Sequence, residues 1–156
     1  MSLVIFWHKP LKLENLETPE NLKGKAGIYI ITHDSTIFYI GKAGKGNAIV
    51  REAKNRENKY IKCLKQMGLM PSDENYYKYF YEHCRVYCGI VSDDAQQSDQ
   101  LDFLLSNAEK LIIYEVSKVK LLCNKKSIRK YKSVKPFKVI NRGESPPGLK
   151  DQYSPI

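Results

Sequence analysis

The sequence predicts an α+β fold in which helices flank a small, three-stranded, mainly antiparallel sheet. Two β-rich runs, residues 27–33 and 37–42, surround a short polar turn, which is the pattern of a β-hairpin. A further run rich in β-branched residues, 85–91, predicts the third strand. Apolar residues at helical spacing over 47–67 and 101–112 predict the flanking helices.

Length and composition favour a single domain over residues 1–156. A chain of 156 residues, 42% of them hydrophobic, is large enough to bury a core. No apolar run approaches the roughly 18 residues that a membrane helix needs, and the N-terminus lacks the pattern of a secretory signal. We therefore expect no membrane partner and a cytoplasmic location, and the oligomeric state stays open.

The four cysteines favour a reduced protein. None of them forms a C-x-x-C pair, and their spacing does not suggest a secreted disulfide framework. His83 and Cys84, together with Cys88, offer a zinc site as an alternative. Residues 84 and 88 share one face of the predicted strand, however, where small apolar side chains are expected.

The turn of the hairpin decides which faces its two tyrosines occupy. A two-residue turn at Asp34 and Ser35 would place Tyr29 and Tyr39 on opposite faces of the sheet. A three-residue turn would place them directly opposite each other on one face. Two hydroxyls that act in one site need the same face, so we predict an odd-length loop or a bulge.

The other early elements follow in chain order. Residues 4–7 predict a short strand before the hairpin. The glycine-rich turn 42–47 after the hairpin does not match a Walker phosphate-binding loop. Asn47 is suited to cap a single helix that ends at Met67. The tyrosine-rich run 76–81 has the composition of an extended segment.

Glu109 interrupts the apolar stripe of the second predicted helix, which begins in the polar run 92–100. It lies four residues after Leu105 and three before Ile112, so it points along the buried face. An unpaired carboxylate there costs several kcal/mol. The position therefore predicts a cationic partner, which is either a basic side chain or a metal ion, unless Glu109 reaches water at the edge of the stripe.

The net charge of +9 is concentrated in one segment. Residues 118–138 contain nine basic residues and no acid, with Tyr131 and Phe137 among them. Such a run is either a solvated basic face or a surface that contacts phosphates, with aromatic groups for stacking. Prolines and glycines from Ser133 onward predict an extended tail that wraps the surface.

Several motifs occur in a characteristic order. The triplets Gly27–Tyr29 and Tyr39–Gly41 are followed by Arg51, then Glu109, then Asn124. In these features the chain resembles the GIY-YIG nuclease family, which is named for the two triplets.

The resemblance covers residues 24–125 as a catalytic core and leaves 126–156 as a basic, Pro/Gly-rich C-terminal extension. It implies a GIY-YIG-like fold and a metal-dependent endonuclease that hydrolyses phosphodiester bonds in DNA. RNA is an open alternative substrate, and the role in restriction, homing or repair is open too. A rival function is a nucleic-acid-binding module of the same fold that cleaves nothing. A weaker one is a domain whose basic tail binds an acidic protein.

The resemblance also assigns roles to five residues. Glu109 would hold one Mg²⁺ or Mn²⁺ ion, a hard cation that prefers oxygen ligands and keeps several waters. Arg51 would bind the scissile phosphate with its planar guanidinium. Tyr29 would act as general base or orient the attacking water, with Tyr39 hydrogen-bonding in the same pocket. Because a tyrosine pKa is near 10, Lys42 or the metal ion would have to lower it.

Further residues complete the expected site. Asn55 stands where many relatives have histidine or tyrosine, and His33, on the same side of its strand as Tyr29, could substitute as a base. The expected supporting residues are Gly27, Gly41, His33, Asn55 and Asn124. The expected nucleic-acid-binding residues are Lys45, Lys125, Lys126, Arg129, Lys130 and Lys132.

Overall fold

A computed structural model describes residues 2–44, 48–71, 75–124 and 137–154. The strands are β1 (Ser2–Trp7), β2 (Leu11–Lys12), β3 (Gly27–His33), β4 (Thr36–Ala43), β5 (Cys84–Val91), β6 (Lys138–Gly143) and β7 (Gln152–Tyr153). The helices are the 3-10 turn η1 (Glu20–Leu22) and α1 (Ile49–Lys54), α2 (Glu57–Gln66), α3 (Tyr76–His83), α4 (Asp93–Gln96) and α5 (Leu101–Ser117).

The strands form one mixed sheet in the order β4-β3-β5-β1-β6-β7, with β2 also paired to β5. The predicted hairpin and third strand are present as β3, β4 and β5, which pair antiparallel. The prediction of a small three-stranded sheet is nevertheless wrong. β1 adds to β5 antiparallel and β6 adds to β1 in parallel, so the sheet has seven strands.

The described part of the C-terminal extension, residues 137–154, adds two strands to this sheet, so the prediction of a tail that wraps the surface is wrong for these residues. β6 pairs with β1 along six residues, from Ser2 opposite Lys138 to Trp7 opposite Gly143. The indole Nε1 of Trp7 donates a hydrogen bond to Asn141 Oδ1 at 2.8 Å. The prolines that suggested a tail lie outside β6 and β7. The segment as a whole therefore has the composition of a tail, although its two short strands can pair in the sheet.

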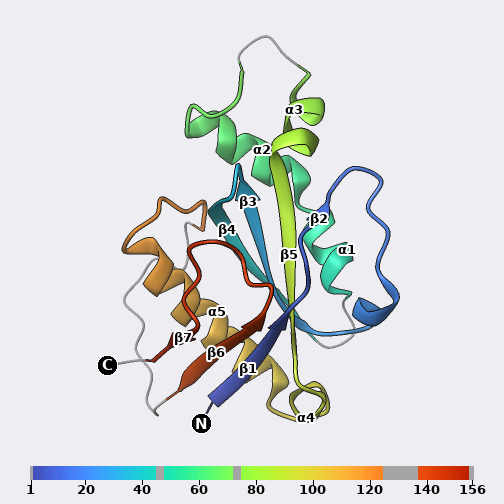
Figure 1. Cartoon of the computed structure of the whole chain (residues 1–156), viewed down its shortest axis with the longest axis vertical. Helices are drawn as coiled ribbons and strands as arrows, with labels where there is room; N and C mark the ends of the chain where they lie inside the picture. The colour runs from blue at the N-terminus through green and yellow to red at the C-terminus, as the bar shows by residue number, and fades with distance from the viewer. Residues whose placement is uncertain (1, 45–47, 72–74, 125–136, 155–156) are drawn as a thin grey trace.

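Each face of the sheet carries its own hydrophobic core. On one face, Leu105 and Ile112 of α5 belong to the same buried cluster as Ile30. On the other face, Ile49 of α1 and Leu64 of α2 cluster with Ile31. Figure 1 shows α5 and α1 on opposite sides of the strands. The hairpin therefore lies between helices, as the sequence predicted.

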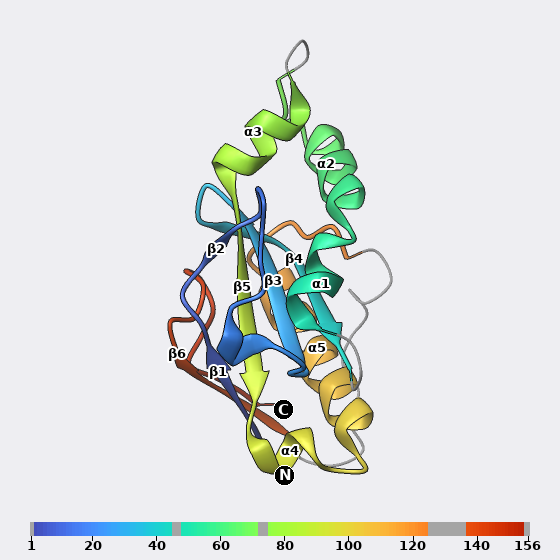
Figure 2. The same ribbon diagram turned by 90° about the vertical axis from the view of Figure 1, so that its right-hand side faces the viewer.

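Two helical expectations are wrong. The single helix predicted to end at Met67 is two helices, α1 and α2, because the chain bends at Arg56 (φ −108°, ψ 17°). The run 76–81, expected to be extended, lies in α3. There the side chain of Asn75 accepts the N–H of Lys78 at 3.2 Å and caps the helix. Figure 2 shows α2 and α3 beside each other, at the end of the sheet that carries the β3–β4 turn.

The register of the hairpin places both tyrosines on one face. The turn has two residues, Asp34 and Ser35, both with positive φ (47° and 68°). A bulge at Ile31 and Thr32 then shifts the pairing, so Tyr29 lies opposite Gly41 and Ile31 opposite Tyr39. The predicted bulge and the shared face are confirmed, although the two tyrosines are diagonal rather than direct partners.

Among the helices that the structure describes, each is too short or too polar to cross a lipid bilayer.

Candidate active site at the edge of strand β4

A pocket of about 440 Å³ lies where the outermost strand, β4, passes between α1 and α5. Side chains from both faces of the sheet meet here around the strand's free edge. Its lining residues are Tyr29, Tyr39, Gly41, Lys42, Gly44, Glu52, Arg56, Asp102, Leu105 and Glu109. Of the five residues expected to be catalytic, the structure brings four together here and leaves out Arg51.

The two tyrosines lie side by side on the α1 face. Their ring centroids are 6.1 Å apart and the planes are nearly parallel, at 25°. A Cβ added to Gly41 would lie 2.2 Å from Cζ of Tyr29, so the phenol ring crosses directly over this glycine. Gly41 therefore provides the space through which Tyr29 reaches the edge of the strand. Glycine is required at position 27 for a different reason, because a Cβ there would clash with the carbonyl oxygen of Gly89 on β5.

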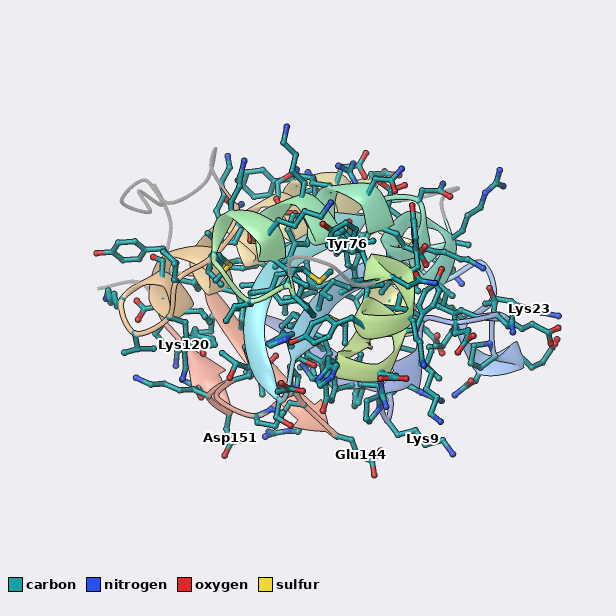
Figure 3. The ribbon with its side chains drawn as sticks, turned by 90° about the horizontal axis from the view of Figure 1, so that it is seen from above. Lys9, Lys23, Tyr76, Lys120, Glu144 and Asp151 are labelled. Carbon is teal, nitrogen blue, oxygen red and sulfur yellow. A yellow bond between two sulfur atoms is a disulfide. The ribbon has the colours of Figure 1, made fainter. Side chains whose placement is uncertain are left out.

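Glu109 enters the pocket from α5. It is half-buried, and among the described residues its carboxylate has no hydrogen bond and no ion pair. Burial raises its pKa, although Lys42 and Arg56 oppose this effect. Charged side chains elsewhere, such as Lys9 and Glu144, extend into solvent (Figure 3). Glu109 thus has neither a direct basic partner nor full hydration, as expected for a carboxylate whose partner is a ligand.

Two cationic side chains approach the carboxylate from different elements. Lys42 Nζ donates a hydrogen bond to Ser106 Oγ, one turn before Glu109 on α5. Arg56, at the bend between α1 and α2, donates to Glu52 Oε1 from Nε (3.2 Å) and Nη2 (3.0 Å). These bonds occupy two of the five N–H groups of the guanidinium, and the other three can bind an anion.

The arginine that lines the pocket is not the one that the sequence predicted. Arg51 is exposed on α1 and does not line the pocket, whereas Arg56 does. The bend between α1 and α2 is the cause, because Arg56 is the N-cap residue of α2 and does not continue α1. Asn55, the last residue before that bend, is also exposed and outside the pocket.

The environment of Tyr29 argues against the role of general base. Burial, and to a lesser degree the neighbouring Tyr39, raises the pKa of Tyr29 well above its ordinary value, opposite to the lowering that the sequence analysis required. Tyr60 of α2, whose ring centroid lies 5.0 Å from that of Tyr39, is also fully buried, and its hydroxyl donates to the carbonyl of Ala53 at 2.8 Å. A neutral Tyr29 can donate a hydrogen bond but cannot accept a proton from water.

Asn124 lies beside the pocket and holds the backbone of β4. Its Oδ1 accepts the N–H of Ile40 at 3.0 Å, and its Nδ2 donates to the carbonyl of the same residue. The N–H of Cys123 donates to the carbonyl of Phe38 at 2.8 Å. These bonds fasten the segment after α5 to both sides of Tyr39, so Asn124 positions that tyrosine.

A second pocket, of about 450 Å³, shares Tyr39, Arg56 and Glu109 with the first. Lys59 and Lys62 of α2 also line it, and Lys59 Nζ lies 5.2 Å from the centroid of the Tyr39 ring. The two pockets together form a groove along the edge of β4. Its α2 side is positively charged.

The cysteines differ from the reduced state expected. Cys63 of α2 and Cys123 form a disulfide in the wall of the second pocket, with Cα atoms 6.1 Å apart. Cys84 and Cys88 are free and buried, and burial raises the pKa of both thiols to about 12. They are core side chains on one strand face, as the sequence suggested, and not thiolate ligands.

Other predicted site residues lie elsewhere. His33 is at the far end of β3, in contact with Tyr79 and Asp34, and does not line the pocket. It therefore does not substitute as a base there. The expected nucleic-acid-binding residues Lys45, Lys125, Lys126, Arg129, Lys130 and Lys132 lie outside the described residues.

The pocket offers oxygen donors for a metal ion. Glu109, Asp102 and Glu52 contribute carboxylates and the tyrosines contribute hydroxyls, with no sulfur or imidazole among the lining residues. Such a donor set fits a hard cation of the Mg²⁺ type. Within the described part of the chain, these carboxylates do not form a close group of three, so one acid with water ligands is the arrangement that fits.

The sequence analysis missed Arg56, Glu52 and Asp102. A usable signal existed for the first two, because Glu52 and Arg56 are spaced i,i+4 and so can pair on one helix face. Asp102 is one of several acids near the start of α5, and nothing in the sequence distinguishes it.

Comparisons of the chain with protein-family models, curated proteins and solved structures found no match.

Proposed function

We propose that this chain is a metal-dependent endonuclease of GIY-YIG type that hydrolyses phosphodiester bonds in DNA. The observation that carries the proposal is the first pocket at β4. It combines a half-buried carboxylate that has no ion pair with any described residue, two phenols, a lysine and an arginine. Phosphodiester cleavage requires a positioned water and compensation of the charge that builds on the phosphate, and these are the groups that supply both.

Each side chain has a distinct part. Glu109 would hold the Mg²⁺ or Mn²⁺ ion, which when bound supplies positive charge beside the phosphate. Arg56, not Arg51, would bind the phosphate through the N–H groups that Glu52 leaves free. Tyr29, as a neutral phenol, would orient the attacking water, and Tyr39 would hydrogen-bond to the same phosphate or water.

The basic groove extends the proposal to the substrate. Lys59 and Lys62 follow Arg56 along α2 and face the second pocket. Side chains at this spacing can contact successive phosphates of one strand. DNA is the proposed partner, and the same contacts would serve RNA. A cytoplasmic location is part of the proposal, and reducing conditions there would open the Cys63–Cys123 disulfide.

The decisive experiment is a nicking assay on supercoiled, linear and branched DNA with and without Mg²⁺ or Mn²⁺. The wild-type chain should nick only with the ion and stop on addition of a chelator. Glu109→Gln should reduce the rate at least about 100-fold. Glu115→Gln is the matched control, because Glu115 lies on the same helix but pairs with Lys118 at 3.2 Å. Full activity of the Glu109 variant would refute the proposal.

The alternative is a nucleic-acid-binding module that does not cleave. The lysines along the groove favour it as much as they favour the enzyme. If about five basic side chains meet phosphates, log K should fall with log salt at a slope of about −4 to −5 in either case. Steep salt dependence without ion-dependent nicking would select the module. A slope near zero would count against both functions.

A further inference from the structure

A second cluster of ionisable side chains lies at the other end of the β3–β4 hairpin. His83 Nδ1 donates a hydrogen bond to Asp34 Oδ1 at 2.8 Å. His33 Nε2 lies 3.7 Å from the other carboxylate oxygen of Asp34 and 2.8 Å from the hydroxyl of Tyr79. One nitrogen of each histidine and a carboxylate oxygen of Asp34 all lie within 4.8 Å of one another.

The backbone holds these side chains in place. Asp34 has positive φ (47°), and its N–H donates to the carbonyl of His83 at 2.9 Å, which fixes the turn against the junction of α3 and β5. His33 pairs in register with Cys84, the residue after His83. The two imidazole rings are nearly parallel, with centroids 5.9 Å apart. The ligand atoms therefore come from the end of β3, from the turn that follows it and from the end of α3.

The three side chains of the cluster are exposed to solvent to different degrees. The side chain of His33 is 11% exposed, that of His83 is 36% exposed, and that of Asp34 is 59% exposed. An ion could enter from the Asp34 side and find one nearly buried nitrogen behind it. Tyr79 stacks on His83 with centroids 4.1 Å apart and limits the movement of that ring.

The donor set differs in kind from that of the pocket at β4. Two imidazole nitrogens and one carboxylate oxygen suit zinc and neighbouring transition metals, whereas Mg²⁺ prefers oxygen alone. Binding of an ion would move the imidazole proton of His83 from Nδ1 to Nε2, which replaces the hydrogen bond to Asp34 by a lone pair at Nδ1 for the ion. Ligand atoms around a tetrahedral zinc ion are about 3.3 Å apart, given bond lengths near 2.0 Å. The three ligand atoms, which lie within 4.8 Å of one another, would have to approach to that spacing when the ion binds.

We propose that His33, Asp34 and His83 form a binding site for a divalent transition-metal ion such as Zn²⁺, with the Tyr79 hydroxyl or water as the fourth ligand. The site joins the hairpin turn to the end of α3 and is structural. It does not depend on the proposed nuclease function. His33 and Tyr29 are four residues apart on one strand, so the two sites are about 13 Å apart.

Cobalt is a suitable probe, because Co²⁺ in a tetrahedral site absorbs visible light and Zn²⁺ displaces it. The full-length, oxidised protein should bind one equivalent of Co²⁺, and Zn²⁺ but not excess Mg²⁺ should remove the band. Zinc binding is then measured by calorimetry, and the melting temperature is recorded with and without Zn²⁺.

The variants are chosen to keep the fold. Asp34→Asn retains a residue that tolerates positive φ and can still accept the bond from His83. His83→Gln removes the second ligand. Both should weaken Zn²⁺ binding at least about tenfold and abolish the rise in melting temperature. His8→Gln is the matched control, because His8 is the chain's only other histidine and its ring, among the described residues, hydrogen-bonds to the carbonyl of Lys9.

Glu109→Gln separates the two sites, since it should leave zinc affinity unchanged while abolishing nicking. Equal zinc affinity of the wild type and the Asp34 and His83 variants would overturn the proposal, and so would a wild type that binds less than one equivalent. Loss of zinc binding in His8→Gln would place the ion elsewhere and overturn it too.

Discussion

The two ends of the β3–β4 hairpin both gather ionisable side chains, but a carboxylate has different partners at each end. At the turn, Asp34 is exposed and already bonded to His83. At the open end, Glu109 is half-buried and has no ion pair among the described residues. At the turn end the carboxylate already has an imidazole partner within the protein, whereas at the pocket end the carboxylate of Glu109 has none among the described residues. We infer that the pocket end is arranged for a ligand that carries both a cation and phosphate.

The largest expected effect distinguishes the two candidate arginines of the pocket end. Arg56→Gln should reduce ion-dependent nicking by about 100-fold, because its guanidinium is the one that faces Glu109 and the tyrosines. Arg51→Gln is the matched control and should remain within about threefold of the wild type, since Arg51 lines neither of the two pockets. The reverse order in a plasmid assay would restore the assignment made from the sequence.

The next effect concerns the glycine that opens the pocket end. Gly41→Ala should lower stability by about 1–3 kcal/mol, because the new Cβ would lie 2.2 Å from the Tyr29 ring. Denaturant titration measures this loss, and nicking should fall with it. At the turn end the opposite substitution, Ser35→Gly, should be neutral or slightly stabilising, since φ is 68° there. A neutral Gly41→Ala would mean that Tyr29 does not cross the strand here.

The smallest effect is the pH dependence of Glu109. Its pKa is raised in the folded protein, so the folded state takes up this proton at higher pH than the unfolded chain. Ionised Glu109 therefore lowers stability at neutral pH, and this cost disappears as the pH falls below the ordinary pKa of 4.5. Glu109→Gln should melt slightly above the wild type at pH 7 and together with it at about pH 4.

Thermal melts across this pH range test whether Glu109→Gln raises or lowers the melting temperature at pH 7. Glu115→Gln, whose carboxylate pairs with Lys118, should give no such gain. A Glu109 variant that is less stable than the wild type at pH 7 would mean that the carboxylate has a stabilising partner.

Local patterns predicted the parts of the fold that depend on local contacts. The hairpin, the strand after Cys84 and the stripe of α5 follow from periodicity, and the position of Glu109 follows from the stripe. With a two-residue turn, Tyr29 and Tyr39 can share a face only if the hairpin contains a bulge. The sequence therefore predicted that a bulge could be present, but it did not predict its position at Ile31 and Thr32.

The errors arise where distant residues decide the outcome. The paired residues of β1 and β6 are more than 130 positions apart in the sequence, and a local pattern cannot indicate a partner at that distance. The tyrosines of 76–81 have strand composition, but the cap at Asn75 and packing of Phe80 in the core hold them in a helix. The Cys63–Cys123 disulfide joins residues separated by 60 positions. Arg56 was not predicted as a site residue because the bend that places it in the pocket contains no proline or glycine, the residues that indicate a helix break in a sequence.

The parallel pairing of β1 and β6 has a consequence for the order of folding. β3, β4, β5 and α5 are complete once residue 117 has been synthesised, and β1 can already pair with β5. The other side of β1 stays open until β6 is made. A nascent or truncated chain would expose that unpaired strand to other molecules, so we expect chains ending before residue 138 to aggregate even though every residue of the pocket is present.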